Sequence, residues 1–470
     1  MDKQIWMGKL LILALLVPLT LYIKTLLPTV AFWDTGEFQT IAYTLDVAHP
    51  TGYPTYLVIG KIFVSLFPFG SIAWRMNLLS ALFVSTGLFI FALLVKKITN
   101  SNLLGILSSF LLATNPYLWS VAIRADPHAL HFLFTTIFLL LTFDCIKEKN
   151  KNLFTALSFI TGLSLGNHMI SVFFVPPLII TGLYLIKEMG LKQTYKTVTV
   201  SVTMFLVGIS IYALLPIISL SKPPLTTEYS VSNLENLKRH VFGEDFQGLM
   251  KTWSKGNYKD TFIFYFSLIQ KSLPMYSWVF IILGVIISFL RKSVFSVVLH
   301  FTFIGTVLFG LTYQNAVIER YFIPSFAIGV IWFSLAFSYL YQKHKTVLLS
   351  LAIAIFMISL SAQNILLNYE KIDASHDVYP REWGIETFQN TKQNGVVFSW
   401  WSYSTPLWYL QKIEDMRPDV TIINSGMENW ENKALEYLDS NAVYFIQEIN
   451  LQNPNLKLIK SGSLYELRRS

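Results

Sequence analysis

The run NLLSALFVSTGLFIFALLVK, residues Asn77–Lys96, contains a single charged residue, the lysine at its end. A helix of about 20 apolar residues crosses the roughly 30 Å of hydrocarbon in a bilayer. Similar apolar runs recur along most of the chain. Of its 470 residues 53% are hydrophobic and only 14% are charged, whereas soluble domains carry about 25% charged residues. The sequence therefore predicts an α-helical polytopic membrane protein.

About eleven transmembrane helices are expected, because a backbone in lipid must satisfy its own hydrogen bonds. The segments between 153 and 187 are either two spans or two half-helices, since Gly166-Asn167-His168 and Pro176-Pro177 interrupt them. The predicted helices lie near 9–27, 77–96, 102–119, 129–146, 153–166, 169–187, 198–219, 265–290, 295–313, 321–341 and 346–363.

The basic residues predict the orientation, because short loops rich in lysine and arginine stay in the cytoplasm. If the N-terminus is cytoplasmic, every short basic loop falls on the same side of the membrane. The net charge of +8 is dispersed over these loops, so it does not indicate a nucleic-acid-binding protein. The single cysteine, Cys145, excludes an intramolecular disulfide. The inner basic residues are Lys96, Lys97, Lys147, Lys149, Lys151, Lys187, Lys192, Lys196, Arg291, Lys292, Lys343 and Lys345.

With eleven crossings, loops 28–76, 114–128 and 220–264 and the tail after residue 363 face away from the cytoplasm. We therefore expect a transmembrane domain, 1–363, in the cytoplasmic membrane, whose outer loops carry the functional residues. The remainder, 364–470, is expected to form an extracytoplasmic domain.

The tail has the pattern of a small α/β domain. Three apolar runs, Val396–Phe398, Val420–Ile423 and Ala442–Ile446, alternate with helix-like stretches, which is typical of parallel strands joined by crossovers. The aromatic residues of Ser399–Tyr403 follow the first predicted strand. They suit either a sugar ring or, the interpretation we favour, docking on the bilayer surface.

The first outer loop contains two acidic residues directly after the first membrane helix, Asp34 and Glu37. If a helix begins there, their i,i+3 spacing places both on one face. Carboxylates beside an apolar membrane edge are costly unless they are paired or used. Asp34 is therefore a candidate catalytic residue. Glu37 is either a second catalytic residue or the partner of Asp34 in a helix cap.

Three motifs in this region, Phe32–Phe38 (FWDTGEF), Ala48–Pro54 (AHPTGYP) and Trp74–Ser80 (WRMNLLS), resemble a bacterial membrane family. That family has vertebrate relatives that act as protein O-mannosyltransferases, and the wider set is the GT-C superfamily of polytopic glycosyltransferases. Glu319–Ser325 (ERYFIPS) and Pro406–Gln411 (PLWYLQ) support the resemblance.

The resemblance implies a GT-C-like fold, a catalytic base in the first outer loop, and a polyprenyl-phosphate sugar as donor. On this basis Asp34 is the base. The second outer loop departs from the family pattern. Relatives tend to carry a Glu-Val-Tyr-type sequence where this chain has Arg124–His131 (RADPHALH). Donor or acceptor preference is therefore expected to differ.

Transfer from a lipid phosphate requires a base for the acceptor hydroxyl and cations for the leaving phosphate. Arginine suits the bidentate geometry of phosphate, although arginines at helix ends also serve as headgroup anchors. The histidines and Asp126 lack a close metal-ligand spacing, so we expect no metal and no cofactor. The candidate substrate-binding residues are His49, Tyr53, Arg75, Arg124, Asp126, His128, His168, Arg320 and Tyr321.

The sequence thus favours an inverting glycosyltransferase. It would move a sugar, with mannose as one candidate, from a polyprenyl phosphate to a hydroxyl of an exported protein or glycan. Two alternatives stay open. A transporter or flippase of lipid-linked sugars usually shows paired repeats, and none is found in this sequence. A non-catalytic subunit of envelope glycan synthesis would tolerate replacement of Asp34.

Overall fold

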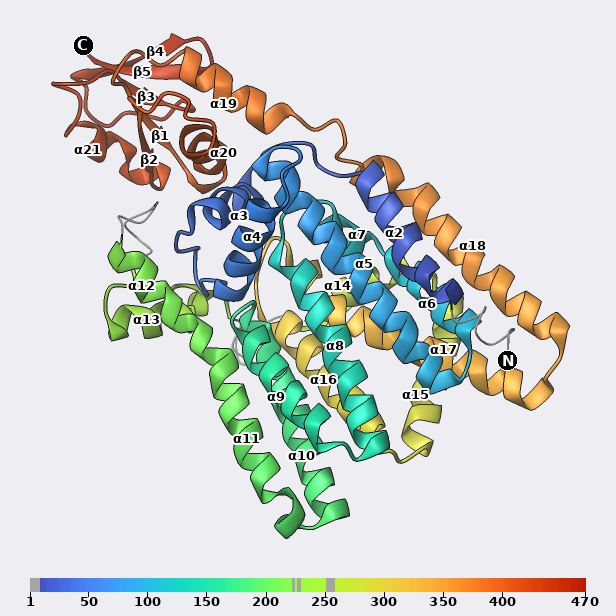
Figure 1. Ribbon diagram of the computed structural model, residues 1–470. Helices are drawn as coiled ribbons and strands as arrows, with labels where there is room; N and C mark the ends of the chain where they lie inside the picture. The colour runs from blue at the N-terminus through green and yellow to red at the C-terminus, as the bar shows by residue number, and fades with distance from the viewer. Residues whose placement is uncertain (1–8, 222–224, 226–229, 251–257) are drawn as a thin grey trace.

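The computed structural model describes residues 9–221, 225, 230–250 and 258–470, which form a helical bundle and a C-terminal five-stranded sheet (Figure 1). The long helices of the bundle occupy the segments predicted from the apolar runs. They are α2 (Leu13–Lys24), α5 (Ile72–Thr99), α6 (Asn102–Ala113), α8 (Pro127–Glu148), α9 (Lys151–Leu165), α10 (Val175–Met189), α11 (Leu191–Ile209), α12 (Leu214–Ser221), α14 (Tyr258–Ser272), α15 (Trp278–Leu290), α16 (Val294–Thr312), α17 (Ile323–His344) and α18 (Val347–Ile372).

Within the described residues, seven helical segments are long and apolar enough to cross a membrane, or eight if α14 and α15 form one broken span. The protein is therefore a multi-pass membrane protein. Three predicted crossings correspond to shorter helices: Leu10–Lys24, α6 and α9. The figure of eleven crossings stays a prediction.

Two predicted helices differ in the structure. The segment 265–290 is not one helix, because α14 and α15 meet at an angle of 89° around Pro274, whose ring prevents a continuous helix. The predicted helix 102–119 ends at Ala113, and a separate helix, α7 (Pro116–Ala122), follows. The side chain of Asn115 caps α7 by accepting hydrogen bonds from the backbone N–H groups of Tyr117 and Leu118.

The spans differ in how much of their surface other helices cover. In the most apolar window of the span Ile318–His344, which contains α17, 89% of the residues are buried, whereas the value is 22% for Leu191–Ser221 and 28% for α18. Helix α17 is thus the centre of the bundle. The exposed sides of α11 and α18 are apolar, as expected for surfaces in contact with lipid.

The first outer loop folds into two short helices that the span prediction did not contain, α3 (Trp33–Thr44) and α4 (Pro54–Leu66). Pro54 occupies the first turn of α4, where its missing N–H costs no hydrogen bond. Much of α3 is buried, although it holds polar residues such as Gln39 and Thr40. The side-chain amide of Gln39 donates to Asn77 Oδ1 at 2.8 Å and so connects α3 to α5. Part of the predicted outer loop 220–264 lies outside the described residues; its described part contains α13 (Leu234–Val241).

The C-terminal sheet confirms the predicted α/β pattern and extends it. Strands β1 (Val396–Ser399), β2 (Thr421–Asn424) and β3 (Val443–Phe445) are parallel, with β1 in the middle. The sequence did not indicate β4 (Leu456–Ser461) or β5 (Leu464–Arg469), an antiparallel pair that extends the sheet in the order β2-β1-β3-β5-β4. The helices of this unit are α19 (Tyr379–Gln389), α20 (Trp401–Lys412) and α21 (Trp430–Ala434).

Helix α20 joins the sheet unit to the bundle by packing against α3. Gly36 permits this contact, because a Cβ at that position would lie 2.2 Å from the carbonyl oxygen of Ala31 and 2.9 Å from Oγ1 of Thr405. A second contact is the hydrogen bond from the backbone N–H of Ala73 to the hydroxyl of Tyr409 at 3.1 Å. The first outer loop therefore lies between the bundle and the sheet (Figure 1).

Helices α9 and α11 approach closely through glycine, as small residues allow in membranes. A Cβ on Gly162 would lie 2.2 Å from the carbonyl oxygen of Phe205, whereas a Cβ on Gly329 in α17 meets no atom within 4 Å. We expect Gly162→Ala to lower the free energy of unfolding by about 1–3 kcal/mol, the usual cost of overpacking. Gly329→Ala is the matched control and should be neutral or stabilising. Thermal unfolding in detergent measures both, and equal midpoints would contradict this account of the α9–α11 contact.

Candidate active site

Asp34 lies in the first turn of α3, where the helix dipole favours a negative charge. It does not cap the helix: the N-cap position belongs to Phe32, and no side chain bonds to the first turn there. Its Oδ1 accepts a hydrogen bond of 2.9 Å from the indole N–H of Trp401, the first residue of α20. The carboxylate is half-buried, so it is held in place and still reachable.

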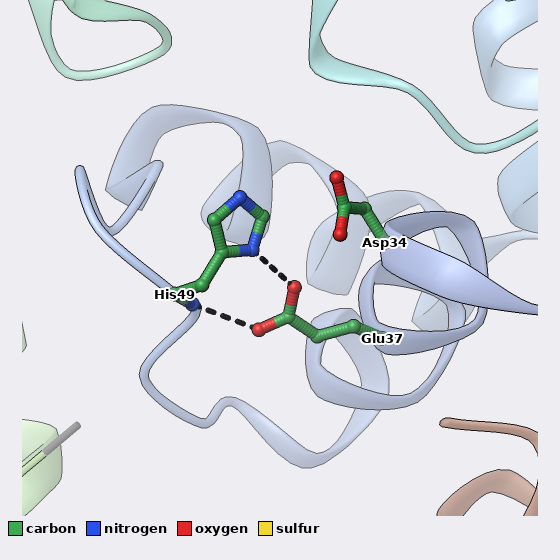
Figure 2. A group of neighbouring side chains, drawn as sticks. All are labelled: Asp34, Glu37 and His49. Carbon is green, nitrogen blue, oxygen red and sulfur yellow. Dashed lines mark hydrogen bonds and ion pairs between the residues drawn. The ribbon is translucent and has the colours of Figure 1, made fainter. Parts of the chain in front are cut away.

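Glu37 lies one turn further along α3 and is fully occupied by His49 (Figure 2). One carboxylate oxygen accepts from the backbone N–H of His49 at 2.8 Å, and the other lies 2.5 Å from Nδ1 of the same residue. The helix-cap interpretation of Glu37 is therefore wrong, because its partner is the loop that follows α3. This pair fixes the His49 ring close to both acidic side chains.

The protonation of this group follows from burial and charge. Burial raises the pKa of the Glu37 carboxyl, and the opposing charge and hydrogen bonds of His49 only partly offset it. For His49, burial lowers the pKa, but the carboxylates of Glu37 and Asp34 outweigh it and raise the pKa to about 9. His49 is thus a cation at neutral pH.

A continuous row of rings connects His49 to the middle of the bundle. The Tyr53 hydroxyl lies 3.3 Å from His49 Nε2. From there the ring centroids are separated by 5.6 Å between Tyr53 and His168, 4.6 Å between His168 and His128, and 4.8 Å between His128 and Tyr321. The structure therefore brings together residues that were singled out in four separate parts of the sequence.

The far end of the row is a buried ion pair. Asp126 caps α8 through a hydrogen bond from the backbone N–H of His128, and its Oδ1 lies 3.0 Å from His128 Nδ1. Its other oxygen accepts from Arg320 Nη1 at 2.9 Å. Burial raises the pKa of Asp126, but the charge of Arg320 and the bonds from His128 outweigh it and lower the pKa to about 2.

The other two arginines predicted to bind substrate, Arg124 and Arg75, differ in position. Arg124 lies near this ion pair. Burial and the charge of Arg320 lower its pKa, whereas the charge of Asp126 raises it. Arg75 lies outside the row. Its guanidinium donates four hydrogen bonds to backbone carbonyls of Val64, Pro68, Phe69 and Gly70, so it stabilises the turn between α4 and α5.

Trp401 is the site residue that the sequence analysis missed. Its signal was present, since the aromatic segment Ser399–Tyr403 follows β1 at the edge of the sheet where ligands of α/β domains bind. The interpretation favoured from the sequence, docking on the bilayer surface, does not describe Trp401. The structure places its indole on Asp34, and its ring lies 5.9 Å from that of His49.

Asp34, Glu37 and His49 also have the composition of a cation site, because their ligand atoms all lie within 4.8 Å of one another (Figure 2). Most of these atoms already have partners, however. Both oxygens of Glu37 and Nδ1 of His49 are used by the pair, and Oδ1 of Asp34 is used by Trp401. A cation that used Nδ1 of His49 would have to displace its hydrogen bond to Glu37, whereas Oδ2 of Asp34 has no hydrogen bond among the described residues.

Comparison with solved structures identifies the fold. The crystal structure of ArnT from Cupriavidus metallidurans bound to undecaprenyl phosphate superimposes with a TM-score of 0.65, covering 97% of each chain at 10% sequence identity. Its apo form gives 0.64. The chain has the GT-C fold. At this identity the similarity demonstrates the GT-C architecture and not a shared substrate.

Sequence comparison finds similarity to protein O-mannosyl-transferases. Residues 34–193, which begin at Asp34, match the family described as the protein O-mannosyl-transferase TMEM260 N-terminal domain. The mouse protein O-mannosyl-transferase TMEM260 is 30% identical over 219 residues, 45% of this chain and 31% of the mouse protein. The Dictyostelium discoideum protein of the same name is 23% identical, over 87% of this chain and 56% of its own length. The chain thus spans less than two thirds of either relative.

The His49 cation gives a testable pH dependence. Because its pKa is raised from 6.5 to about 9, His49 is protonated at pH 7 and loses its proton as the pH rises through about 9. Asp34 and Glu37 then face each other without an intervening positive charge. We expect kcat/KM of the reaction at this site to fall with an apparent pKa near 9. His49→Gln should have lower activity without that alkaline limb, and an unchanged limb in this variant would assign it to another group.

The occupied ligand atoms give a second prediction. Since Glu37, His49 and Asp34 already form hydrogen bonds with protein groups, we expect the activity of this site to be unchanged after dialysis against EDTA. The assay is the reaction rate before and after chelation, with dialysis against plain buffer as the control. A loss of activity that Mn²⁺ or Mg²⁺ restores would make this cluster a metal site.

Proposed function

We propose that this protein is an inverting glycosyltransferase that moves mannose from a polyprenyl-phosphate donor to a hydroxyl group of an exported protein or glycan. The observation that carries the proposal is the Asp34 carboxylate. It is held at the start of α3 in a GT-C fold, next to a row of basic and aromatic side chains. The names of the relatives, protein O-mannosyl-transferases, support mannose and a protein acceptor. The undecaprenyl phosphate bound to ArnT supports a lipid-linked donor.

In this reaction Asp34 takes the proton of the acceptor hydroxyl. The freed oxygen attacks the anomeric carbon on the face opposite the phosphate, so the configuration inverts. The bond between the anomeric carbon and the phosphate oxygen breaks, and its electron pair leaves with the polyprenyl phosphate. Asp34 later releases its proton to water. The His49 cation stabilises the negative charge near the base before the proton is transferred.

The leaving phosphate gains negative charge and needs donors in a region with little water. Arg320 and Arg124 lie at the far end of the row, where Arg320 pairs with Asp126 and Arg124 interacts electrostatically with both. Arg320 is already bonded to Asp126, which orients its guanidinium, and its other N–H groups, which have no hydrogen bond among the described residues, would be available to a phosphate. The rings of His128, His168, Tyr53 and Tyr321 lie in the row between these cations and Asp34 and would contact the sugar.

We further propose that this site faces away from the cytoplasm and that the N-terminus is cytoplasmic. The α8–α9 and α10–α11 turns, which carry lysines such as Lys149 and Lys192, lie at the end of the bundle opposite the C-terminal sheet (Figure 1). Under the positive-inside rule that end is cytoplasmic. The C-terminal sheet and α3 would then be on the side where exported acceptors arrive.

Replacement of Asp34 tests the base. Asp34→Asn keeps the size of the side chain and removes the proton acceptor, so we expect kcat to fall about 10²–10⁴-fold, the usual contribution of a general base. The assay uses purified protein, labelled polyprenyl-phosphate mannose, and peptide and glycan acceptors. Asp439→Asn is the control, because it makes the same change at a carboxylate whose side chain is 76% exposed.

Full activity in folded Asp34→Asn would mean that another group is the base. Absence of transfer by the wild-type protein, with the lipid bound but unused, would favour a transporter of lipid-linked sugars.

A further inference from the structure

Among the described residues, the only hydrogen bond to the Asp34 carboxylate comes from the indole of Trp401, 367 residues further along the chain. This contact joins the bundle to the C-terminal sheet unit. We propose that Trp401 is a positioning residue for the catalytic base, so that the C-terminal unit completes the active site. The inference rests on the proposed function, in which Asp34 accepts the proton of the acceptor hydroxyl.

The chemistry of an indole suits this role. Its N–H donates and cannot accept, so it bonds to the carboxylate without competing for the proton that Asp34 must take. The bond uses Oδ1 at 2.9 Å and leaves Oδ2 to face the acceptor. A carboxylate without such a bond would rotate about its side-chain torsions, and a misplaced base transfers protons less efficiently.

Trp401 is itself held by rigid elements, as a positioning residue must be. It is the first residue of α20, which follows the central strand β1 directly. Its ring packs edge-on against Trp408 at 5.6 Å and against His49 at 5.9 Å. Behind it, Ser404 in the first turn of α20 is bonded to Ser399 at the end of β1 at 2.7 Å. The position of the indole is therefore defined by the sheet unit and by these two ring contacts.

The neighbouring residue provides a matched control. Trp400 also has a half-buried indole, yet within the described part of the chain its N–H has no hydrogen-bond partner. Trp400→Phe and Trp401→Phe thus remove the same group from adjacent positions. Only the second substitution removes a bond to Asp34.

The first experiment measures steady-state transfer by both variants. A hydrogen bond to a charged group is commonly worth about tenfold to a hundredfold in rate, so kcat should fall by that factor in Trp401→Phe. KM for the lipid donor should stay within about twofold, because Trp401 orients the base and not the lipid. Trp400→Phe should match the wild type. Trp401→His, which restores an N–H donor, should recover part of the loss.

Combining substitutions tests whether Trp401 acts through Asp34. In an Asp34→Asn background, Trp401→Phe should have little further effect on the residual rate, since the group that it positions is already gone. Equal losses in both backgrounds would overturn the proposal. So would an unchanged kcat in Trp401→Phe, or a loss of the same size in Trp400→Phe.

A spectroscopic readout separates this proposal from the proposed function. The protein is labelled with 5-fluorotryptophan, and the ¹⁹F resonance that is missing from Trp401→Phe belongs to Trp401. Asp34→Ala should move that resonance, whereas Asp439→Asn should not. An unmoved resonance would overturn the contact itself. A wild-type protein without transfer activity would instead overturn the proposed function, and the resonance would still decide whether Trp401 binds Asp34.

Discussion

The arrangement of the site depends on one buried pair, the two-point attachment of Glu37 to His49. A carboxylate in this position would be costly alone, and both its oxygens are satisfied by a single residue. The pair ties the loop after α3 back onto the helix. It thereby sets the position of the His49 ring beside Asp34 and the start of the row that leads through Tyr53. The buried Glu37 carboxylate thus anchors the loop that follows α3.

The charges of the site alternate along the row. At one end the acidic side chains of α3 enclose the cation of His49, and at the other Asp126 lies between His128 and Arg320. Neutral rings separate the two groups. Each charge is therefore compensated locally, which is the condition under which ionised groups persist away from water. The sugar and its phosphate would enter between two centres that are already balanced.

The sequence predicted most helices and the three parallel strands, because helices that face lipid and strands of a buried sheet both consist of continuous apolar residues. It did not predict β4 and β5, whose residues include exposed lysines and arginines such as Lys457 and Arg468, so no apolar run marked them. Pro274 indicates the break between α14 and α15, but an average of hydropathy over the whole segment does not detect this break. In the site, local motifs indicated Asp34 and Glu37. The partners Trp401 and Arg320 lie 367 and 194 residues from Asp34 and Asp126, and no spacing within a motif connects residues so far apart.

The length of chain between Asp34 and Trp401 has a consequence for biosynthesis. A ribosome makes residue 34 before helices α4 to α18 and residue 401 after them, so all of these helices are synthesised while the carboxylate still lacks its indole partner. Strand β1 must then form with its neighbours before α20 can lie on α3. The order of synthesis therefore delays assembly of the reactive centre until the membrane helices are in place, and a chain truncated before residue 401 contains the acid without the side chain that holds it.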